Sequence, residues 1–414
     1  MRILIFEPDS GGHRYTYIRH LLTGLKPLDG IDSITLVTSK SGYESDAYQA
    51  QLKPIEEGVN VAAEIDIPAG SQLDVAKLRY NALEETLKRH EADHLYVPSA
   101  DGLTQVLGAR ALLPGGKIIP PSMTTEAAMH RGSFAYPASG FQQKAKVALG
   151  LKTIERSPWT RIHFVDPLGY EAAKVISPKL ATRSVVLADP VDAVQEINKK
   201  QARKNLGIEQ GGRWLGVSGA IDARKGCDKL LAAFDMAKLG DNDRLLLAGR
   251  AHDDIRALVK DKYQHHIDSG RLVMIDRYLS DDELGWSLSG MDVVCTAHPS
   301  HVGLSNIALR ALAANRLVLG SSFGWLGRVV PAFEMGVVCN VSSAAEFAGA
   351  IEQSLDAAQW YKRTPAGKRL LEFHSQANHI AGWTTLIREK LGLPAPDVKT
   401  WEWATEGVKQ SAAS

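Results

Sequence analysis

The feature that most constrains this chain is the alternation of short apolar runs with helix-length segments along its whole length. Strand-like runs occur near residues 2–6, 34–38, 94–97, 117–119, 161–165 and 184–187, and again at 214–219, 244–248, 272–275, 291–297 and 317–320. Between them, apolar residues recur at helical spacing, as in the segment 14–25. This alternation predicts an α/β fold of doubly wound parallel sheets whose faces are covered by helices.

The chain divides into two halves of similar size. A polar, charged segment at 188–213 has no strand-like run until Trp214, and the strand–helix pattern then starts again. At 414 residues and 44% hydrophobic content, the chain can bury more than one core. We expect a first Rossmann-like domain at 1–192 and a second at 193–372. A helix at 373–392 and a tail at 393–414 follow, and the two domains would face each other across a ligand-binding cleft.

Composition excludes several classes of protein. Lys and Arg total 48 against 47 Asp and Glu, so a net charge of +1 gives no reason to expect a nucleic-acid partner. The widely spaced Cys227, Cys295 and Cys339 favour buried thiols over a disulfide framework. No segment has a signal-peptide pattern, and no apolar run approaches the ~18 residues that span a bilayer. We therefore expect a soluble, cytoplasmic protein.

One stretch, residues 278–330, carries the strongest binding signal. It reads as a helix, a buried strand at 291–297, a glycine-bearing loop, a helix beginning at Asn306 and a second buried strand. A loop that leaves a parallel strand and opens a helix presents backbone N–H groups and the positive end of the helix dipole. The residues Gly303, Leu304, Ser305 and Asn306 are therefore a predicted phosphate cradle.

Three loops at strand ends in the first half are further candidates. Gly11, Gly12 and His13 follow the first strand, where glycines let the backbone approach a ligand, although a plain tight turn explains them equally well. Asp101 follows the strand at 94–97, and a long loop is expected at 120–140. That loop would hold Glu126 and His130, and with Asp101 these are the candidate catalytic groups.

The segment 141–161 is rich in lysine and arginine and contains one acidic residue, Glu155. A basic helix of this kind is typical of a solvated surface, and it also suits contact with an anionic membrane or an anionic acceptor. Both readings stay open. The acidic pairs Asp253-Asp254 and Asp281-Asp282 precede helical patterns and are interpreted as helix starts, so no metal ligands are predicted.

Several blocks in order carry a resemblance to a known family. VSGAIDARKGCDKLLAAF, LLLAGR, YLSDDELGWSLSGMDVVCTAHPS and GLSNIALRALAANRLVLGSSFGWLGRVV resemble the carboxyl-terminal domain of GT-B glycosyltransferases of family 4. The opening SGGHRYTYIRHLL is similar to that family's first strand, glycine loop and helix. The resemblance covers most of the chain, and it implies a transferase that uses a nucleotide-sugar donor, most simply a UDP- or GDP-sugar.

The resemblance also implies roles for particular residues. In the family, a glycine-led turn holds an arginine and a lysine that contact the donor diphosphate. Here that turn begins at Gly219, Lys225 matches the lysine, and Ala220 stands at the arginine position, so Arg224 is expected to replace its charge. Gly249, at the end of the LLLAGR block, is also expected to line the donor site.

The largest departure from the family is the loss of two donor-binding glutamates. Their positions are occupied by Val302 and Arg310. A carboxylate accepts hydrogen bonds from sugar hydroxyls, whereas arginine only donates and valine does neither. Three readings follow: a rearranged donor site with Arg310 on a phosphate and His298 or His301 near the sugar, an inactive binding or partner subunit that keeps the fold, and a sugar-nucleotide epimerase.

The resemblance implies a mechanism without a bound metal or other cofactor. Positive side chains and helix N-termini would stabilise the departing diphosphate. The family usually retains the configuration of the transferred sugar. The acceptor is not identified by the sequence.

Overall fold

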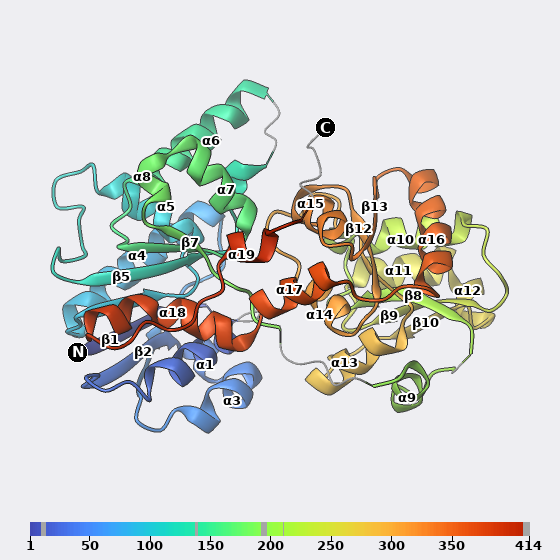
Figure 1. Cartoon of the computed structure of the whole chain (residues 1–414), viewed down its shortest axis with the longest axis horizontal. Helices are drawn as coiled ribbons and strands as arrows, with labels where there is room; N and C mark the ends of the chain where they lie inside the picture. Colours follow the sequence, from blue (N-terminus) through green and yellow to red (C-terminus); the bar gives the residue numbers. More distant parts are fainter. Residues whose placement is uncertain (10–13, 137–139, 192–196, 210, 409–414) are drawn as a thin grey trace. The chain divides into compact units, whose positions relative to one another are not determined.

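The computed structural model describes residues 1–9, 14–136, 140–191, 197–209 and 211–408. These residues form two compact units. The first holds residues 1–189 and 376–401, and the second holds residues 190–375 and the segment that begins at Glu402 (Figure 1). The chain therefore leaves the first unit after residue 189, returns to it at residue 376 and passes to the second unit again at Glu402. The predicted cleft between the units stays a prediction.

The first unit is built on a seven-stranded parallel sheet with the order β3-β2-β1-β4-β5-β6-β7. Its strands are β1 (Arg2–Glu7), β2 (Ser33–Ser39), β3 (Asn60–Ile65), β4 (His94–Val97), β5 (Thr124–Met129), β6 (Arg161–Phe164) and β7 (Ser184–Val186). Its helices are α1 (Arg14–Leu25), α2 (Lys40–Tyr43), α3 (Asp46–Gln51), α4 (Gln72–Arg89), α5 (Asp101–Arg110), α6 (Gly140–Glu155), α7 (Pro167–Ile176), α8 (Pro178–Ala181) and α18 (Gln376–Lys390).

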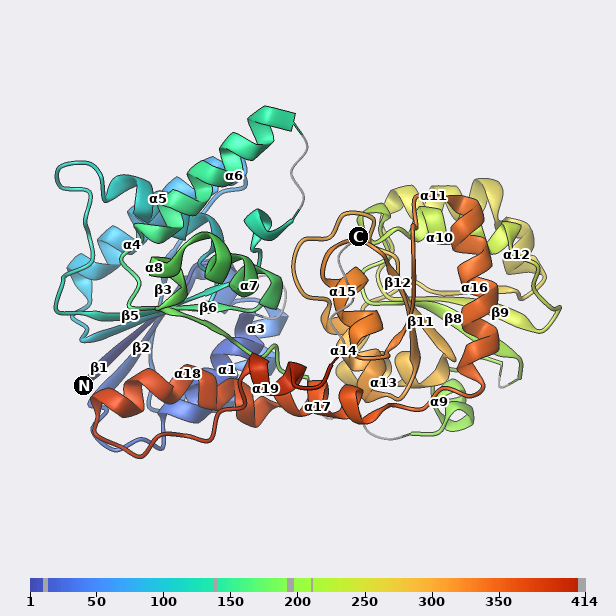
Figure 2. The same cartoon turned by 45° about the horizontal axis from the view of Figure 1, so that its top comes forward.

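Both faces of this sheet are buried, which explains why its central strands read as continuous apolar runs. Along β1, Leu4 and Phe6 pack into a core with α4, α5 and α6, while Ile3 and Ile5 pack into a second core with α1, α3 and α18. Figure 2 shows these two helical layers on opposite sides of the sheet. Because side chains alternate along a strand, one short apolar segment anchors both layers.

The last helix of the first unit comes from the end of the chain. Trp383 and Ile387 on α18 are fully buried in the core that includes α1. A Cβ added to Gly24 on α1 would lie 2.5 Å from Ile380, so the two helices pack closely. α19 (Trp401–Thr405) follows, with Trp401 and Ala404 buried.

The second unit repeats the architecture with a six-stranded parallel sheet of order β10-β9-β8-β11-β12-β13. Its strands are β8 (Arg213–Ser218), β9 (Asp243–Ala248), β10 (Leu272–Ile275), β11 (Val293–Thr296), β12 (Leu317–Ser321) and β13 (Gly336–Cys339). Its helices are α9 (Lys199–Asn205), α10 (Cys227–Met236), α11 (Asp253–Lys262), α12 (Gln264–Asp268), α13 (Asp281–Gly290), α14 (Asn306–Ala313), α15 (Gly324–Ala332), α16 (Ala344–Ala358) and α17 (Pro365–Phe373). α10, α11 and α16 share one core on this sheet. The predicted doubly wound α/β fold is therefore confirmed for both halves.

The acidic helix starts are confirmed as well. α11 begins at Asp253 and α13 at Asp281. At α13 the side chain of Ser280 accepts from the backbone N–H of Glu283, and the Glu283 carboxylate accepts from the N–H of Ser280. This capping box satisfies two helix-end donors, so the acidic residues have a structural role there.

The prediction of a strand at 117–119 and a loop at 120–140 is wrong. The strand of this region is β5, and Glu126 lies within it, with no exposed surface. The sequence TTEAAM gives a weak strand signal because it contains a charged residue and few large apolar residues. The charge is accommodated by the neighbouring strands: His163 on β6 lies 2.7 Å from one carboxylate oxygen and His94 on β4 lies 3.2 Å from the other.

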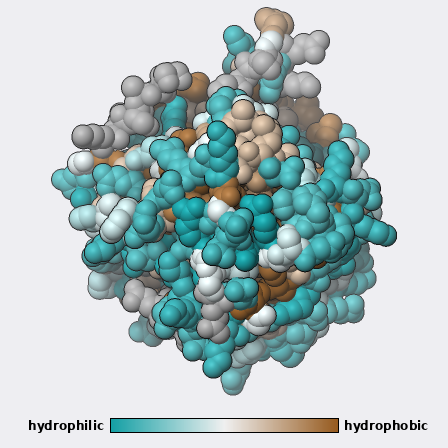
Figure 3. All heavy atoms as spheres, turned by 90° about the vertical axis from the view of Figure 1, so that its right-hand side faces the viewer, coloured by the Kyte–Doolittle hydropathy of each residue, from teal (hydrophilic) through white to brown (hydrophobic). Residues whose placement is uncertain are grey.

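Because the helices pack their apolar sides against the cores, their polar sides should form most of the surface. The face drawn in Figure 3 is mainly hydrophilic, with small separate apolar areas. Among the described residues, no helix is both long and apolar enough to cross a membrane. The basic segment forms α6, on which Phe141 and Leu149 are exposed, and its contact with a membrane or an acceptor stays a prediction.

Candidate functional site

The strand order of the second unit marks one place where a ligand would bind. β8 pairs with β9 on one side and with β11 on the other, so the order of the chain reverses between β8 and β11. In open parallel sheets, ligands bind beyond the carboxyl ends of the strands at such a switch point. The loops that leave those ends are residues 219–226 after β8 and residues 297–305 after β11.

Glycines let three loops approach one another at backbone distance. A Cβ on Gly249, after β9, would lie 1.8 Å from the carbonyl oxygen of Gly219, and a Cβ on Gly226 would lie 2.2 Å from that of Ala297. All three glycines also have positive φ values, +93° at Gly219, +72° at Gly226 and +139° at Gly249. No other residue type satisfies both requirements without a shift of the backbone. The structure thus joins Gly219 and Gly249, two predicted site residues.

Lys225 is held beside this contact. A Cβ on Gly219 would meet its ammonium nitrogen at 3.3 Å. The loop around it is fixed by Asp222, whose carboxylate accepts from the backbone N–H of Lys225 at 2.7 Å. Burial lowers the pKa of the Lys225 ammonium, which indicates a cation partly removed from water. The other predicted cation, Arg224, is exposed and pairs with Asp222 at 3.2 Å.

Two histidines from the loop after β11 complete the cluster. The rings of His298 and His301 lie 4.8 Å apart, and Nε2 of His301 lies 3.2 Å from the carbonyl oxygen of Leu304. His298 is buried, and its pKa falls to about 3, first because of burial and then because of the positive charges of His301, Lys225 and Arg224. It is therefore neutral at pH 7. Among the described residues, Nδ1 of this buried ring has no hydrogen-bond partner.

The helix α14 begins directly after this loop. Ser305 precedes its first turn and is buried, and Gly303 has a φ of +111°. Asn306 opens the helix and accepts from Nε of Arg310 at 2.7 Å, one turn further on. Ser305 makes no side-chain cap on this helix end. The first turn of α14 therefore brings the positive end of a helix dipole to this loop, the feature from which the sequence predicts a phosphate cradle here.

Together these groups suit a diphosphate. A partly buried ammonium, helix-end N–H groups and a neutral imidazole offer positive charge and hydrogen-bond donors to phosphate oxygens. The structure thus brings Gly219, Lys225, Gly249, His301 and the segment 303–306 to one edge of one sheet. Sequence reasoning found Gly219, Lys225 and Gly249 through a resemblance and the segment 303–306 through its strand–loop–helix pattern. The burial of His298 is what the structure adds.

The first unit has its own switch point, between β1 and β4. Asp101 and His130 come together there, because Asp101 accepts from the backbone N–H of Arg131 at 3.0 Å and Nε2 of His130 lies 2.9 Å from the carbonyl oxygen of Pro98. Glu126 does not join them. It lies four residues before His130 in β5, about 13 Å along the strand, and the side chain is enclosed by His94 and His163.

The imidazoles of His94 and His163 enclose the Glu126 carboxylate inside the sheet. Burial alone would raise the pKa of its carboxyl, but the hydrogen bond from His163 and the nearby imidazole of His94 outweigh this and bring it to about 2. A carboxylate that is fully ionised and sealed inside the sheet cannot touch a substrate at the strand ends. The predicted residues Gly11, Gly12 and His13 lie outside the described residues.

Sequence reasoning missed Glu7, the last residue of β1. Its side chain is fully buried at the switch point of the first unit, and one carboxylate oxygen accepts from the backbone N–H of Asp9 at 3.2 Å. Burial raises its pKa to about 7; Arg14 opposes this effect and Asp9 adds to it. The signal in the sequence is a charge directly at the end of an apolar strand. A carboxyl that changes its charge near pH 7 suits proton transfer.

Proteins similar to this chain are found among solved structures and not among family models or curated sequences. No family model and no curated protein sequence matches the chain. Among solved structures, it is similar to HepE of Anabaena in complex with UDP and glucose, at 15% identity and a TM-score of 0.63, over 95% of this chain and 99% of the other. It is also similar to sucrose-phosphate synthase of Thermosynechococcus elongatus, at 15% identity and a TM-score of 0.70, over 95% and 99% of the two chains.

A third similar structure is WaaG, a glycosyltransferase involved in lipopolysaccharide biosynthesis, at 13% identity and a TM-score of 0.62, over 94% of this chain and 99% of the other. At such low identities the likeness concerns the fold. The chain has the fold of the GT-B glycosyltransferases, as its sequence predicts.

The tight loop contact gives a prediction with a matched control. Gly226 and Gly207 both have left-handed backbones, with φ of +72° and +67°, but only a Cβ on Gly226 meets another atom within 4 Å. Gly207→Ala should therefore cost only the strain of a left-handed alanine, roughly 1–2 kcal/mol. Gly226→Ala should cost about 1–3 kcal/mol more, because the loop must move away from Ala297. Urea unfolding of both variants measures the difference, and equal losses would contradict the described packing.

The raised pKa of Glu7 gives a second prediction. In the folded chain the pKa of this carboxyl is about 7 instead of the ordinary 4.5, so it keeps its proton to higher pH than in the unfolded chain. Stability should therefore fall as pH rises from about 5 and level off above about 7. Between pH 5 and 8.5 the loss is roughly 2.5 kcal/mol. Glu7→Gln should remove this part of the pH dependence in urea unfolding. Glu57→Gln, at an exposed position, should leave it unchanged, and identical profiles for all three proteins would contradict the assignment.

Proposed function

We propose that this chain is a glycosyltransferase that takes a sugar from a nucleotide-sugar donor and passes it to an acceptor that is still unidentified. The observation that carries the proposal is that a partly buried Lys225 and a buried, neutral His298 both lie on loops at the switch point of the second unit. Positive charge and hydrogen-bond donors are concentrated at this point, beyond the strand ends where folds of this kind bind ligands. The likeness to a protein that was solved with UDP and glucose supports the same assignment.

In this proposal the donor diphosphate lies against the first turn of α14 and the ammonium of Lys225. Arg224 is exposed on the same loop and supplies a second charge to the phosphates. His298 faces the sugar or the phosphate as a neutral group that both donates and accepts, which partly replaces the hydrogen bonds of the absent carboxylates. A UDP-sugar is the first donor to test, and a GDP-sugar is the second.

Departure of the diphosphate then depends on electrostatic stabilisation by groups already in place. A partly desolvated cation and helix-end N–H groups interact more strongly with a phosphate there than they would in water. They also need not reorient as negative charge develops on the leaving diphosphate. The reaction would proceed without a bound metal ion and with retention at the sugar carbon. On the first unit, Asp101 and His130 remain the candidate groups for the acceptor hydroxyl, and Glu7 joins them because its pKa lies near 7.

Arg310 is the residue that decides between the readings of the lost glutamates. It is buried and bonded to Asn306 at the start of α14, so its charge strengthens the positive end of that helix. An arginine that replaces a glutamate here favours phosphate over sugar hydroxyls as its partner. This supports a rearranged donor site more than the epimerase or the inactive subunit.

The test is thermal unfolding with nucleoside diphosphates of uridine, guanosine, adenosine and thymidine and with their sugar conjugates. A ligand at about a hundred times its Kd stabilises the native state by about 2.7 kcal/mol, which should raise Tm by roughly 5–10 °C. One nucleotide should give this shift, and Lys225→Ala and Arg310→Ala should each remove it. Lys260→Ala, which removes an exposed lysine on α11, should keep the full shift.

The outcomes separate the readings. A shift followed by sugar transfer to an added acceptor, or by slow release of free sugar, supports a transferase. A shift without any turnover supports a binding subunit. No shift with any nucleotide would overturn the proposed donor site.

A further inference from the structure

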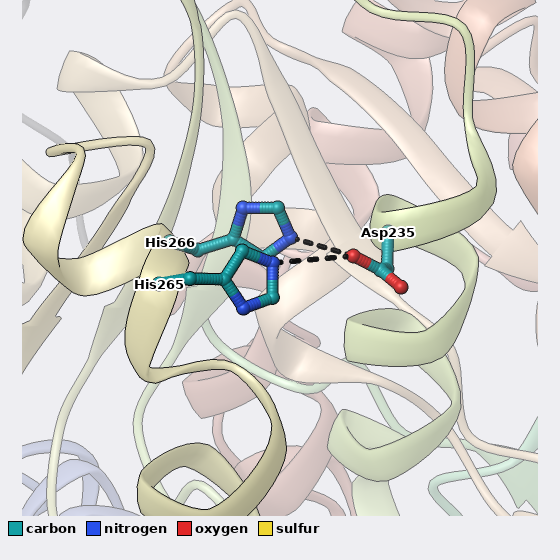
Figure 4. A group of neighbouring side chains, drawn as sticks. All are labelled: Asp235, His265 and His266. Carbon is teal, nitrogen blue, oxygen red and sulfur yellow. Dashed lines mark hydrogen bonds and ion pairs between the residues drawn. The ribbon is translucent and has the colours of Figure 1, made fainter.

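A second cluster of side chains lies in the second unit, away from the donor loops. Asp235 on α10 faces His265 and His266 on α12 (Figure 4). One oxygen of Asp235 lies 2.9 Å from Nε2 of His266 and 3.5 Å from Nε2 of His265. The two imidazole rings are 4.0 Å apart, and the three potential ligand atoms all lie within 4.8 Å of one another.

These separations match those of a metal centre. A tetrahedral zinc ion bonded at about 2.0–2.1 Å places its ligand atoms roughly 3.3 Å from each other. The distances from the Asp235 oxygen to the two imidazole nitrogens, 2.9 and 3.5 Å, lie on either side of that value. The Asp235 oxygen therefore already lies near the tetrahedral ligand separation from both imidazole nitrogens.

The cluster combines one fixed ligand with two accessible ones. His266 is buried, and its ring contacts Phe234 at 5.4 Å and Tyr263 at 6.3 Å between centroids, so its orientation is set by packing. The side chains of Asp235 and His265 are 47% and 60% exposed, which leaves them open to an ion and to water. A buried imidazole of fixed orientation with two exposed partners is a suitable entry site for a cation.

We propose that Asp235, His265 and His266 bind a divalent transition-metal ion, zinc in the first place, with water as the fourth ligand. Two imidazoles and one carboxylate suit zinc, nickel or copper and are poor ligands for magnesium and calcium, which prefer oxygen. The ion would link α12 to the carboxyl end of α10. This proposal does not depend on the proposed transferase function.

The site is too far from the donor loops to take part in the chemistry there. α10 begins at Cys227, next to the loop that holds Lys225, and Asp235 lies eight residues further along. At a rise of about 1.5 Å per residue, this is about 12 Å along the helix. A metal at this place would act by fixing α10, whose first turn borders the donor loop, and by holding α12 against it.

The surroundings also set the expected affinity. An imidazole that binds a metal through Nε2 carries its proton on Nδ1, and metal sites of high affinity give that proton an acceptor. Within the described part of the chain, Nδ1 of His266 has no hydrogen-bond partner. Such missing support typically costs about 10–100-fold in affinity. We therefore expect weaker binding than that of a structural zinc centre.

The experiment uses the full chain purified without a histidine tag and stripped with a chelator. Zinc titration followed by calorimetry should show one ion bound per chain, and magnesium should show none. Zinc at about a hundred times its Kd should raise Tm by roughly 5–10 °C. Cobalt should bind at the same place and give the visible absorption bands of a low-coordinate ion.

Variants at exposed positions distinguish this centre from other surface histidines. His265→Ala and Asp235→Asn should each abolish the zinc-dependent shift and the cobalt bands while leaving Tm in chelator unchanged. His252→Ala is the matched control: His252 pairs with Asp254 at 2.9 Å on an exposed surface but has no second histidine, and this variant should bind zinc like the parent. Failure of the parent to bind zinc, or equal binding by all four proteins, would overturn the proposal.

Discussion

The pairing of β8 with β11 is the contact on which the candidate site depends. In a parallel sheet each strand returns by a helix on one face, and the hand of that crossover is fixed. When the chain order reverses at one strand, the helices leave on opposite faces, and the loops beyond that strand pair diverge. The sequence of this chain produces the reversal twice, once in each unit, so each unit presents one favoured place for a ligand.

Close backbone contact then turns the strand ends of the second unit into a charged site. Gly219, Gly226 and Gly249 allow three loops to meet without side chains between them, and the ammonium of Lys225 lies on that contact. Packing of this kind partly buries a cation and a histidine that water would otherwise solvate. Their lowered pKa values have the same first cause, which is that burial removes the charged form from water.

The sequence predicted the fold well because a short apolar run indicates a buried strand. Arg2–Glu7 and Leu272–Ile275 are such runs, and both form strands. It failed at Thr124–Met129, where two histidines from neighbouring strands accommodate a buried glutamate, since a strand of that composition looks polar. It gave no strand for Asn60–Ile65 for the same reason. Contacts between distant loops, such as that of Gly226 with Ala297, depend on backbone geometry that no local pattern encodes.

The measurement that tests the central claim most directly is hydrogen exchange of the whole chain with and without UDP, read by mass spectrometry of its peptides. If the switch point of the second unit binds the diphosphate, exchange should slow in the loops 219–226 and 297–306 and at the start of α14, because bound phosphate occupies their N–H groups. The peptide that contains α12 should not change. Protection elsewhere, with these loops unaffected, would contradict the account.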